Sequence, residues 1–309
     1  SALVNPAKLI PTAIEFVDIA GLVAGASKGE GLGNRFLAHI REVDAIIHVV
    51  RAFNDDDITH VSGRVDPISD AGTIETELAL ADLETLERAI ERTSKAAKTG
   101  DKKVLRELEI LKTTHEALSN DMQIAALLTE DEVIHALKPL CLLTAKPVVY
   151  VANVAESELE GNEKVEALRQ HAAEAAAQLV VVSAAIEQEI SEIDPNDRLS
   201  FLEDLGLEES GLDKVIRAGY ELLGLQTFFT AGPKEVRAWT VRRGATAPQA
   251  AGEIHTDFER GFIRAETIAY DDFIDLKGEQ GAREAGRLRL EGKEYVLSDG
   301  DIMHFRFNV

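Results

Sequence analysis

Cysteine is nearly absent from this sequence, since Cys141 is the only one among 309 residues. A single cysteine cannot form a disulfide within the chain, so a disulfide-stabilised fold is excluded and a reducing, cytoplasmic setting is expected. No apolar run approaches the roughly 18 residues that a membrane-spanning helix needs, so we expect no membrane partner. The longest apolar runs, at 45–50 and 147–152, have the length of buried strands.

Two ligand-binding signatures are also missing. No Cys/His pattern with zinc spacing occurs, and the acidic run at 54–57 (NDDD) lacks metal-ligand spacing, so a solvated loop is expected there. The string G-x-x-x-x-G-K-[ST], whose amides and lysine hold phosphates, does not occur either. Residues 25–33 (GASKGEGLG) resemble it superficially, but Lys28 is their only lysine and no Gly-Lys-Ser/Thr follows.

Positive charge is scarce, because 33 Lys and Arg face 55 Asp and Glu, which gives a net charge of −22. This balance argues against a protein whose whole surface binds nucleic acid. The charge is unevenly spread: residues 227–309 carry 12 basic and 14 acidic residues, a net of −2, and the rest of the chain holds −20. Any contact with RNA is therefore expected in the C-terminal part.

Short apolar strands alternate with helices in two separated parts of the chain. The expected order is strand 14–18, glycine-rich loop 21–33, helix 34–43, strand 45–50, strand 148–152, helix 162–178 and strand 179–182. This alternation predicts an α/β fold whose parallel sheet is covered on both faces.

Residues 69–139 differ, and their pattern predicts a helical insertion in the α/β domain. Apolar residues recur at helical spacing through 73–98 and through 104–118, with charged residues on the opposite faces. The turn Thr99-Gly100-Asp101 joins the two helices into an antiparallel hairpin and supplies Asp101 as an N-cap. The apolar stripes fit either a packed core alone or an arm that also binds a partner.

A third helix of the insertion is predicted to start at Thr129 and to end at Pro139. Thr129 and Glu132 have the spacing of a capping box.

The end of the chain predicts a small α+β domain at 227–309. Its expected elements are strand 236–241, helix 250–258, strand 263–268, strand 295–297 and strand 303–307. Asp299-Gly300 is a turn signal between the last two strands. The predicted division is a first part of the α/β domain at 1–68, the helical insertion at 69–139, a second part of the α/β domain at 140–226, and the terminal domain at 227–309.

The first predicted strand ends in the pattern D-x-x-G, made by Asp18 and Gly21. In nucleotide-dependent switches, a carboxylate at a strand end holds Mg²⁺, and the glycine lets its amide approach the γ-phosphate. The pattern is common by chance, but a strand end followed by a glycine-rich loop is the expected context.

A second strand ends in Asn153-Val154-Ala155-Glu156, where a GTPase would carry N-K-x-D. The carboxylate is one methylene longer than the aspartate that binds guanine, and Val154 replaces the lysine. Adenine offers a 6-amino donor, which the Asn153 carbonyl can accept. The substitution therefore favours adenine. Ser183 and Ala184, after the next strand, match the loop that backs the base through main-chain N–H groups, although a plain strand-to-helix loop fits equally well.

Residues 17–37 (VDIAGLVAGASKGEGLGNRFL), 153–156 (NVAE), 231–266 and 292–309 together resemble the Obg-like ATPase family of the YchF type. The resemblance covers essentially the whole chain. It implies a P-loop NTPase (G-domain) parallel sheet lacking its N-terminal portion, an α-helical hairpin insertion and a C-terminal β-grasp TGS domain. It also implies hydrolysis of ATP in preference to GTP, with Mg²⁺ and K⁺ as the candidate ions. The implied partners are the ribosome or ribosomal RNA, with the TGS and helical domains as contact regions.

Leu22 follows the D-x-x-G pattern, where Ras-type enzymes have a glutamine that orients the attacking water. Leucine cannot do this, so the resemblance is to the subgroup with a hydrophobic residue at this position. In that subgroup a loop histidine is the proposed substitute, and His60 in the segment 58–63 (ITHVSG) matches it. A histidine that only forms local hydrogen bonds is the alternative interpretation.

The family places its P-loop before residue 1, so Ser1 is not expected to be the natural start, and residues 1–309 alone are expected to bind ATP weakly and not to hydrolyse it. Two functions remain open for the intact protein. One is an ATP-hydrolysing regulatory switch, and the other is a binding module controlled by nucleotide occupancy with negligible turnover. A GTPase is disfavoured by Val154 and Glu156.

Overall fold

The computed structural model describes residues 2–19, 32–60, 63–120, 122 and 124–308. The chain divides into two compact units, one of residues 17–222 and the other of residues 1–16 together with 223–309. The predicted boundary at 226/227 thus lies at 222/223. The assignment of residues 1–16 to the α/β domain was wrong. They join the C-terminal unit because strand β1 (Leu9–Ile10) pairs in parallel with an edge of strand β6 (Val236–Arg242), whose backbone groups need partners.

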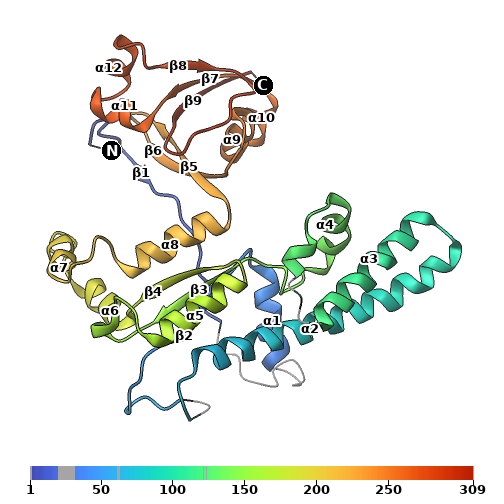
Figure 1. Cartoon of the computed structure of the whole chain (residues 1–309). Coiled ribbons are helices and arrows are strands. Elements are labelled where there is room, and N and C mark those ends of the chain that lie inside the picture. The colour runs from blue at the N-terminus through green and yellow to red at the C-terminus, as the bar shows by residue number, and fades with distance from the viewer. Residues whose placement is uncertain (1, 20–31, 61–62, 121, 123, 309) are drawn as a thin grey trace. The chain divides into compact units, whose positions relative to one another are not determined.

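The described residues of the larger unit form a parallel sheet in the order β2-β3-β4 (Figure 1). Its strands are β2 (Ile46–Arg51), β3 (Val148–Asn153) and β4 (Gln178–Val182). Helix α5 (Glu163–Glu174) packs on one face through Val165 and Leu168, and α8 (Gly211–Leu222) packs on the other through Ala218. The predicted parallel sheet with both faces covered is confirmed.

Residues 14–18, predicted as a strand, are not one. Phe16 and Val17 keep 48% and 49% of their surface exposed, and no described residue pairs with this segment. An apolar run becomes a strand only when a neighbouring strand completes its hydrogen bonds. The composition of this segment therefore predicted its local preference but not its pairing.

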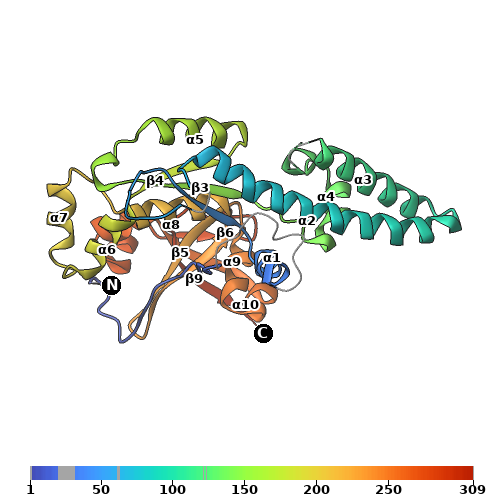
Figure 2. The same ribbon diagram turned by 90° about the horizontal axis from the view of Figure 1, so that it is seen from below.

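The helical insertion is a long antiparallel hairpin, as predicted. Helix α2 (Pro67–Ala96) is followed by the short 3-10 helix η2 (Ala97–Thr99) and by α3 (Lys102–Ser119). Leu86 and Leu111 lie in the buried seam between α2 and α3. Figures 1 and 2 show this hairpin projecting beyond the sheet of the same unit.

The helix ends of the insertion follow local capping chemistry. The Asp66 side chain accepts the Ser69 N–H at the start of α2, and Asp101 accepts the Lys103 N–H at the start of α3, as predicted for Asp101. The predicted capping box of Thr129 and Glu132 was wrong. Helix α4 (Asp131–Leu137) starts one residue later than a Thr129 cap requires, with Glu130 at the N-cap and no side-chain capping bond.

Further helical elements connect the strands of this unit. They are α1 (Leu32–Glu42), η3 (Ile124–Leu127), η4 (Lys138–Leu140), η5 (Glu156–Glu158), α6 (Ala184–Glu192) and α7 (Arg198–Asp204). Within the described residues, no helix is long and apolar enough to cross a membrane.

The C-terminal unit contains a mixed sheet in the order β1-β6-β5-β9-β7-β8. Its other elements are β5 (Leu225–Ala231), α9 (Ala247–Ile254), α10 (Thr256–Arg260), β7 (Phe262–Ile268), α11 (Tyr270–Asp275), α12 (Glu279–Glu284), β8 (Arg289–Glu291) and β9 (Ile302–Phe307). The hairpin β5–β6 is followed by a helix and a return strand, β9, parallel to β5, which is the β-grasp order. The predicted strand at 295–297 was wrong, since this segment makes only an isolated bridge between Val296 and Thr246.

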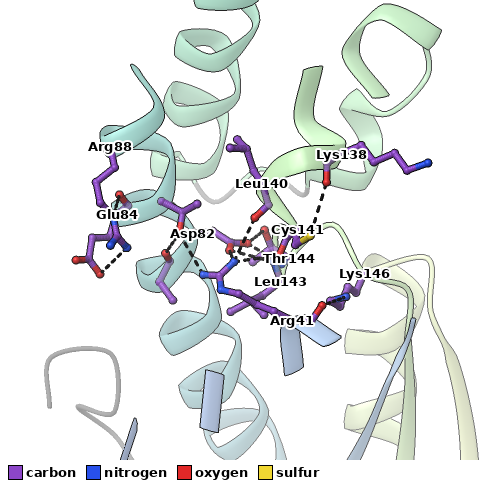
Figure 3. A network of polar contacts seen from close by, with 12 residues as sticks. Arg41, Asp82, Glu84, Arg88, Lys138, Leu140, Cys141, Leu143, Thr144 and Lys146 are labelled. Carbon is purple, nitrogen blue, oxygen red and sulfur yellow. Dashed lines mark hydrogen bonds and ion pairs between the residues drawn. The ribbon is translucent and has the colours of Figure 1, made fainter. Parts of the chain in front are cut away.

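A buried carboxylate joins α2 to the rest of its unit (Figure 3). Asp82 has no exposed surface, and it accepts the N–H of Leu143 at 3.0 Å, the N–H of Thr144 at 2.8 Å and the hydroxyl of Thr144 at 2.8 Å. The guanidinium of Arg41, from α1, lies 3.5 Å away. Burial raises the pKa of Asp82, while these hydrogen bonds and Arg41 oppose the increase. One side chain therefore links α1, α2 and the segment before β3.

Arg41 and Lys146 extend this network. Arg41 donates to the carbonyl of Cys141 at 3.0 Å and to the hydroxyl of Thr85 at 3.1 Å. The Lys146 ammonium donates to the carbonyl of Arg41 at 3.1 Å and also to that of Val43. The last turn of α1 is therefore bonded through both the side chain and the carbonyl of Arg41.

Glu75 forms a second anchor of α2, closer to the sheet. Its carboxylate accepts the Tyr150 hydroxyl at 2.5 Å and lies 2.8 Å from Nε2 of His171 on α5. Burial is the main cause that raises the pKa of Tyr150, and the hydrogen bond to Glu75 and its negative charge raise it further. The phenol therefore stays protonated and donates its hydrogen to Glu75.

We predict that Asp82→Ala lowers the free energy of unfolding by about 3–5 kcal/mol, because it removes the anionic partner of Arg41 and leaves the amides of Leu143 and Thr144 without their acceptor. Urea unfolding followed by far-ultraviolet circular dichroism measures the change. Glu84→Ala is the matched control on the same helix, since it removes an exposed pair with Arg88 and should cost less than about 0.5 kcal/mol. Equal losses in the two variants would contradict a structural role for the Asp82 network.

Candidate functional site

The carboxyl ends of β2, β3 and β4 lie at one edge of the sheet, because the three strands are parallel and paired in register. In open α/β sheets this edge is where ligands bind. The loops that leave it carry His60 after β2, Asn153 and Glu156 at the end of β3, and Ser183 and Ala184 after β4. The structure thus brings together the loops that the sequence analysis selected on these three strands.

Asn153 ties these loops to one another. Its side-chain oxygen accepts the N–H of Ala184 at 3.0 Å, and its carbonyl accepts the N–H of Ala52 at 2.8 Å. The N–H of Val154 in turn donates to the carbonyl of Val182 at 2.9 Å. The backbone and side chain around Asn153 therefore fix the relative position of the loops after β2, β3 and β4.

This arrangement changes the predicted role of the Asn153 side chain. With one lone pair of its oxygen engaged by Ala184, the group keeps two N–H donors and one acceptor site. N–H donors of this kind fit N7, an acceptor that adenine and guanine share. Asn153 is thus suited to bind a purine, and the choice between the two purines falls to its neighbours.

Ser183 and Ala184 begin α6. The Ala184 N–H, predicted to back a base, donates to Asn153 instead. The first bond within the helix joins the Glu187 N–H to the Ser183 carbonyl, so the amides of the first turn before Glu187 have no partner inside the helix. The Ser183 hydroxyl is buried and has no hydrogen-bond partner among the described residues.

Val154 and Glu156 differ sharply in exposure. Only 2% of Val154 is exposed, and its side chain packs against the cluster that contains Val50 and Val165. The Val154 side chain therefore belongs to the core, because an apolar group at a strand end is drawn away from water, and only its backbone remains a candidate for nucleotide contact. Glu156 is exposed in η5, so its carboxylate is accessible to a ligand.

His60 is held by a partner that the sequence analysis missed. Its Nε2 lies 3.0 Å from Oδ2 of Asp70 in the first turn of α2. An acceptor at Nε2 places the proton of a neutral imidazole on that nitrogen, so Asp70 sets both the tautomer and the orientation of the ring. The sequence feature that could have indicated this partner is Asp70 itself, an acidic residue in the first turn of the helix that follows the loop carrying His60.

Arg51 is a second residue that the sequence analysis missed. It donates to the carbonyls of Phe53, Asp55 and Ile58, at 3.1, 3.1 and 3.0 Å respectively. The loop between β2 and His60 is thus wrapped around a guanidinium at the strand end. No spacing rule identifies such a residue, because its partners are backbone carbonyls.

The remaining predicted site residues surround the D-x-x-G pattern. Asp18 is exposed, while Gly21 and Leu22 lie outside the described residues. No group of three or more His, Cys, Asp or Glu that could hold a metal ion is found in the part of the chain that the structure describes. A single exposed carboxylate fits Mg²⁺, which proteins usually bind through one or two carboxylates and the phosphates of the nucleotide.

We predict that Asn153→Ala weakens purine nucleotide binding to the intact protein by roughly tenfold, since it removes the N–H donors and the link to Ala184. Asn153→Asp is the matched variant, because it keeps an oxygen for the Ala184 N–H while it replaces the N–H donors with a negatively charged acceptor. Titration with a fluorescent ATP analogue measures both. Full affinity in Asn153→Asp would show that the side chain only positions the loop.

Two family models match the chain. The model YchF-GTPase_C, described as a protein of unknown function (DUF933), matches residues 225–308. The model MMR_HSR1, described as a 50S ribosome-binding GTPase, matches residues 4–81.

Curated relatives are similar along almost the whole chain. The ribosome-binding ATPase YchF of Haemophilus ducreyi is 60% identical over 99% of this chain and 85% of its own length. The protein of the same name from Bacillus subtilis is 58% identical over the same shares of the two chains. Obg-like ATPase 1 of Rattus norvegicus is 43% identical over 98% of this chain and 78% of its own length.

Solved structures give the same result for the fold. The YchF GTPase of Schizosaccharomyces pombe has a TM-score of 0.86 and 38% identity, and the match covers 99% of this chain and 83% of that one. A GTP-binding protein of Pyrococcus horikoshii has a TM-score of 0.57 at 22% identity, over 88% and 81% of the two chains, and therefore supports the fold alone. With this fold and these identities, the chain belongs to the YchF family of Obg-like P-loop NTPases.

Proposed function

We propose that the intact protein is a cytoplasmic ATPase that acts as a regulatory switch and associates with the ribosome. The relatives at 57–60% identity are named ribosome-binding ATPases, which supports both parts of the proposal. The observation that carries it is the position of Asn153, which links the loops at the carboxyl ends of β2, β3 and β4 and keeps donors for a purine. Asp18 is the candidate ligand for the Mg²⁺ that accompanies ATP, and this ion would neutralise phosphate charge.

Adenine is the proposed base. The guanine-binding N-K-x-D pattern needs a short carboxylate and a lysine, whereas the chain has the longer Glu156 and the buried Val154. Glu156 is exposed three residues after Asn153, at the start of η5, and a carboxylate there can accept the 6-amino group that adenine donates.

We expect ATP to displace a fluorescent nucleotide from the intact protein at a concentration roughly tenfold lower than GTP, since one hydrogen bond to a charged group is worth about 1.5 kcal/mol or more. Competition titrations with the two nucleotides measure this ratio. Glu156→Asp restores the shorter carboxylate of the guanine-binding pattern and should reduce the ratio of ATP affinity to GTP affinity. Glu158→Asp, in the same η5 turn, is the control and should leave this ratio unchanged. Equal affinities for ATP and GTP in the unmodified protein would contradict adenine selection.

His60 is the proposed water-positioning residue. Leu22 cannot orient a water molecule, whereas His60 lies on the loop after a strand at the ligand-binding edge and its ring is oriented by Asp70. The second candidate function, control by nucleotide occupancy, rests on Leu22, because a leucine at this position favours slow hydrolysis.

Single-turnover ATP hydrolysis, with and without ribosomes, separates the two functions. We expect measurable turnover of the intact protein and a loss of roughly 10²-fold in His60→Ala, with unchanged ATP affinity. His115→Ala, which alters a histidine paired with Glu87 on the arm, should hydrolyse ATP normally. Turnover that is negligible under both conditions, or insensitive to His60→Ala, would favour control by occupancy or a different catalytic group.

A further inference from the structure

The end of the α2–α3 hairpin has a charge opposite to that of the rest of its unit. We define the arm tip as residues 91–106. It contains six basic residues and two acidic ones, a net of 6 − 2 = +4; the basic residues are Arg92, Lys95, Lys98, Lys102, Lys103 and Arg106. The unit 17–222 carries 20 basic and 40 acidic residues, a net of −20, so it holds −24 outside the arm tip.

Most of this positive charge is available to a partner. All six basic residues of the arm tip are exposed. Lys95 pairs with Glu91 at 2.7 Å, and Arg106 pairs with Glu109 and Glu132. The other four have no acidic partner within the described chain, and Asp101 uses its carboxylate to cap α3. The positive charge of the arm tip is therefore only partly neutralised by neighbouring acidic residues of the chain.

Helix stability does not explain the lysines at the start of α3. Acidic residues stabilise the first turn of a helix and basic ones oppose its dipole. Helices α2, α4 and α5 follow this rule, with acidic residues in their first turns. Helix α3 has none there and carries Lys102 and Lys103 instead. Helix α7 likewise begins with Arg198 and has no acidic residue in its first turn, so the two lysines do not by themselves indicate a function, but helix stability does not account for them.

The hairpin also separates the tip from the acidic part of its unit. Helix α3 has 18 residues, which at 1.5 Å per residue gives a length of about 27 Å. This distance is about three Debye lengths at physiological ionic strength. The acidic surface at the base of the hairpin is therefore screened from the first turns of the tip, and among the described residues the acidic ones outside the tip that pair with it are Glu109 and Glu132, both at Arg106.

We propose that the arm tip binds the phosphate backbone of RNA on the ribosome. This inference rests on the proposed ribosome association and specifies one of its contact surfaces. Exposed lysine and arginine side chains without acidic partners are what phosphate contacts require. Leu105, 47% exposed, is the one large apolar side chain exposed on the tip, so the tip offers no apolar face for burial in a protein groove or a lipid surface.

The decisive variant is Lys102→Glu combined with Lys103→Glu in the intact protein. It places acidic residues in the first turn of α3, where the helix dipole favours them, so loss of folding does not confound the result. Lys112→Glu with Lys138→Glu is the matched control, since it changes the net charge equally at two exposed lysines outside the tip. A third variant, Lys102→Arg with Lys103→Arg, keeps both charges.

Cosedimentation with purified ribosomes over a series of salt concentrations measures the contact. We expect the Glu variant to bind at least tenfold more weakly, and the slope of log K against log salt to fall by roughly 1–2, since each lost phosphate contact removes 0.7–0.9. The control and the Arg variant should bind like the unmodified protein. ATP hydrolysis without ribosomes should be equal in all four proteins.

A short RNA duplex and vesicles containing phosphatidylserine complete the test, with fluorescence anisotropy and flotation as the measurements. Binding of the duplex that weakens only in the Glu variant supports contact between the tip and an RNA phosphate backbone. If no ribosome binding is found as well, the ribosomal location and the proposed ribosome association fail, while the phosphate contact of the tip stands. Ribosome binding that is unchanged in the Glu variant overturns the inference and leaves the proposed function standing. Vesicle binding without RNA binding overturns it in favour of a lipid surface.

Discussion

The buried carboxylate of Asp82 is the constraint on which the arrangement of the larger unit depends. A charge without exposed surface is stable only if its hydrogen bonds are made by groups held in place. Its partners come from α1, through Arg41, and from the segment before β3, through Leu143 and Thr144. Because these partners must all meet one side chain, α2 cannot slide or rotate relative to α1 and the sheet without breaking the set.

Helix α2 contacts the rest of its unit through acidic residues that include Asp70, Glu75 and Asp82 before it projects as an arm. Asp70 contacts His60, Glu75 contacts Tyr150 and His171, and Asp82 closes the series. Beyond Leu86 its partners belong to the insertion. One continuous helix therefore runs from the candidate water-positioning loop to the arm tip. A displacement of the His60 loop in a nucleotide-dependent state would change the first of these contacts, which offers a physical link between the site and the tip.

The sequence predicted the elements whose pattern is local. The strands β2, β3 and β4, the hairpin and the Asp101 cap follow from apolar runs, helical spacing and turn chemistry. It failed where pairing decides the outcome. Residues 14–18 have strand composition without a strand partner, and residues 1–16 join the C-terminal unit through β1. In the site, the pattern at 153–156 indicated the end of a strand, and β3 does end at Asn153. The bond of Asn153 to Ala184 and the contact of His60 with Asp70 could not be predicted, because they depend on the fold and follow no fixed spacing in the sequence.

Base choice is connected to packing through Val154. In the N-K-x-D pattern the position after the asparagine carries a lysine, but here it holds a valine that is 2% exposed and belongs to the core between the sheet and α5. An ammonium group placed there would lose its hydration, at a cost of several kcal/mol unless its stem reached solvent. A guanine-binding loop would therefore require the core beneath it to be repacked as well. Under the proposed adenine preference, we therefore expect exchange of Glu156 alone to shift the relative affinity for the two bases, whereas full conversion to guanine binding would involve the strand and the helix that support the loop.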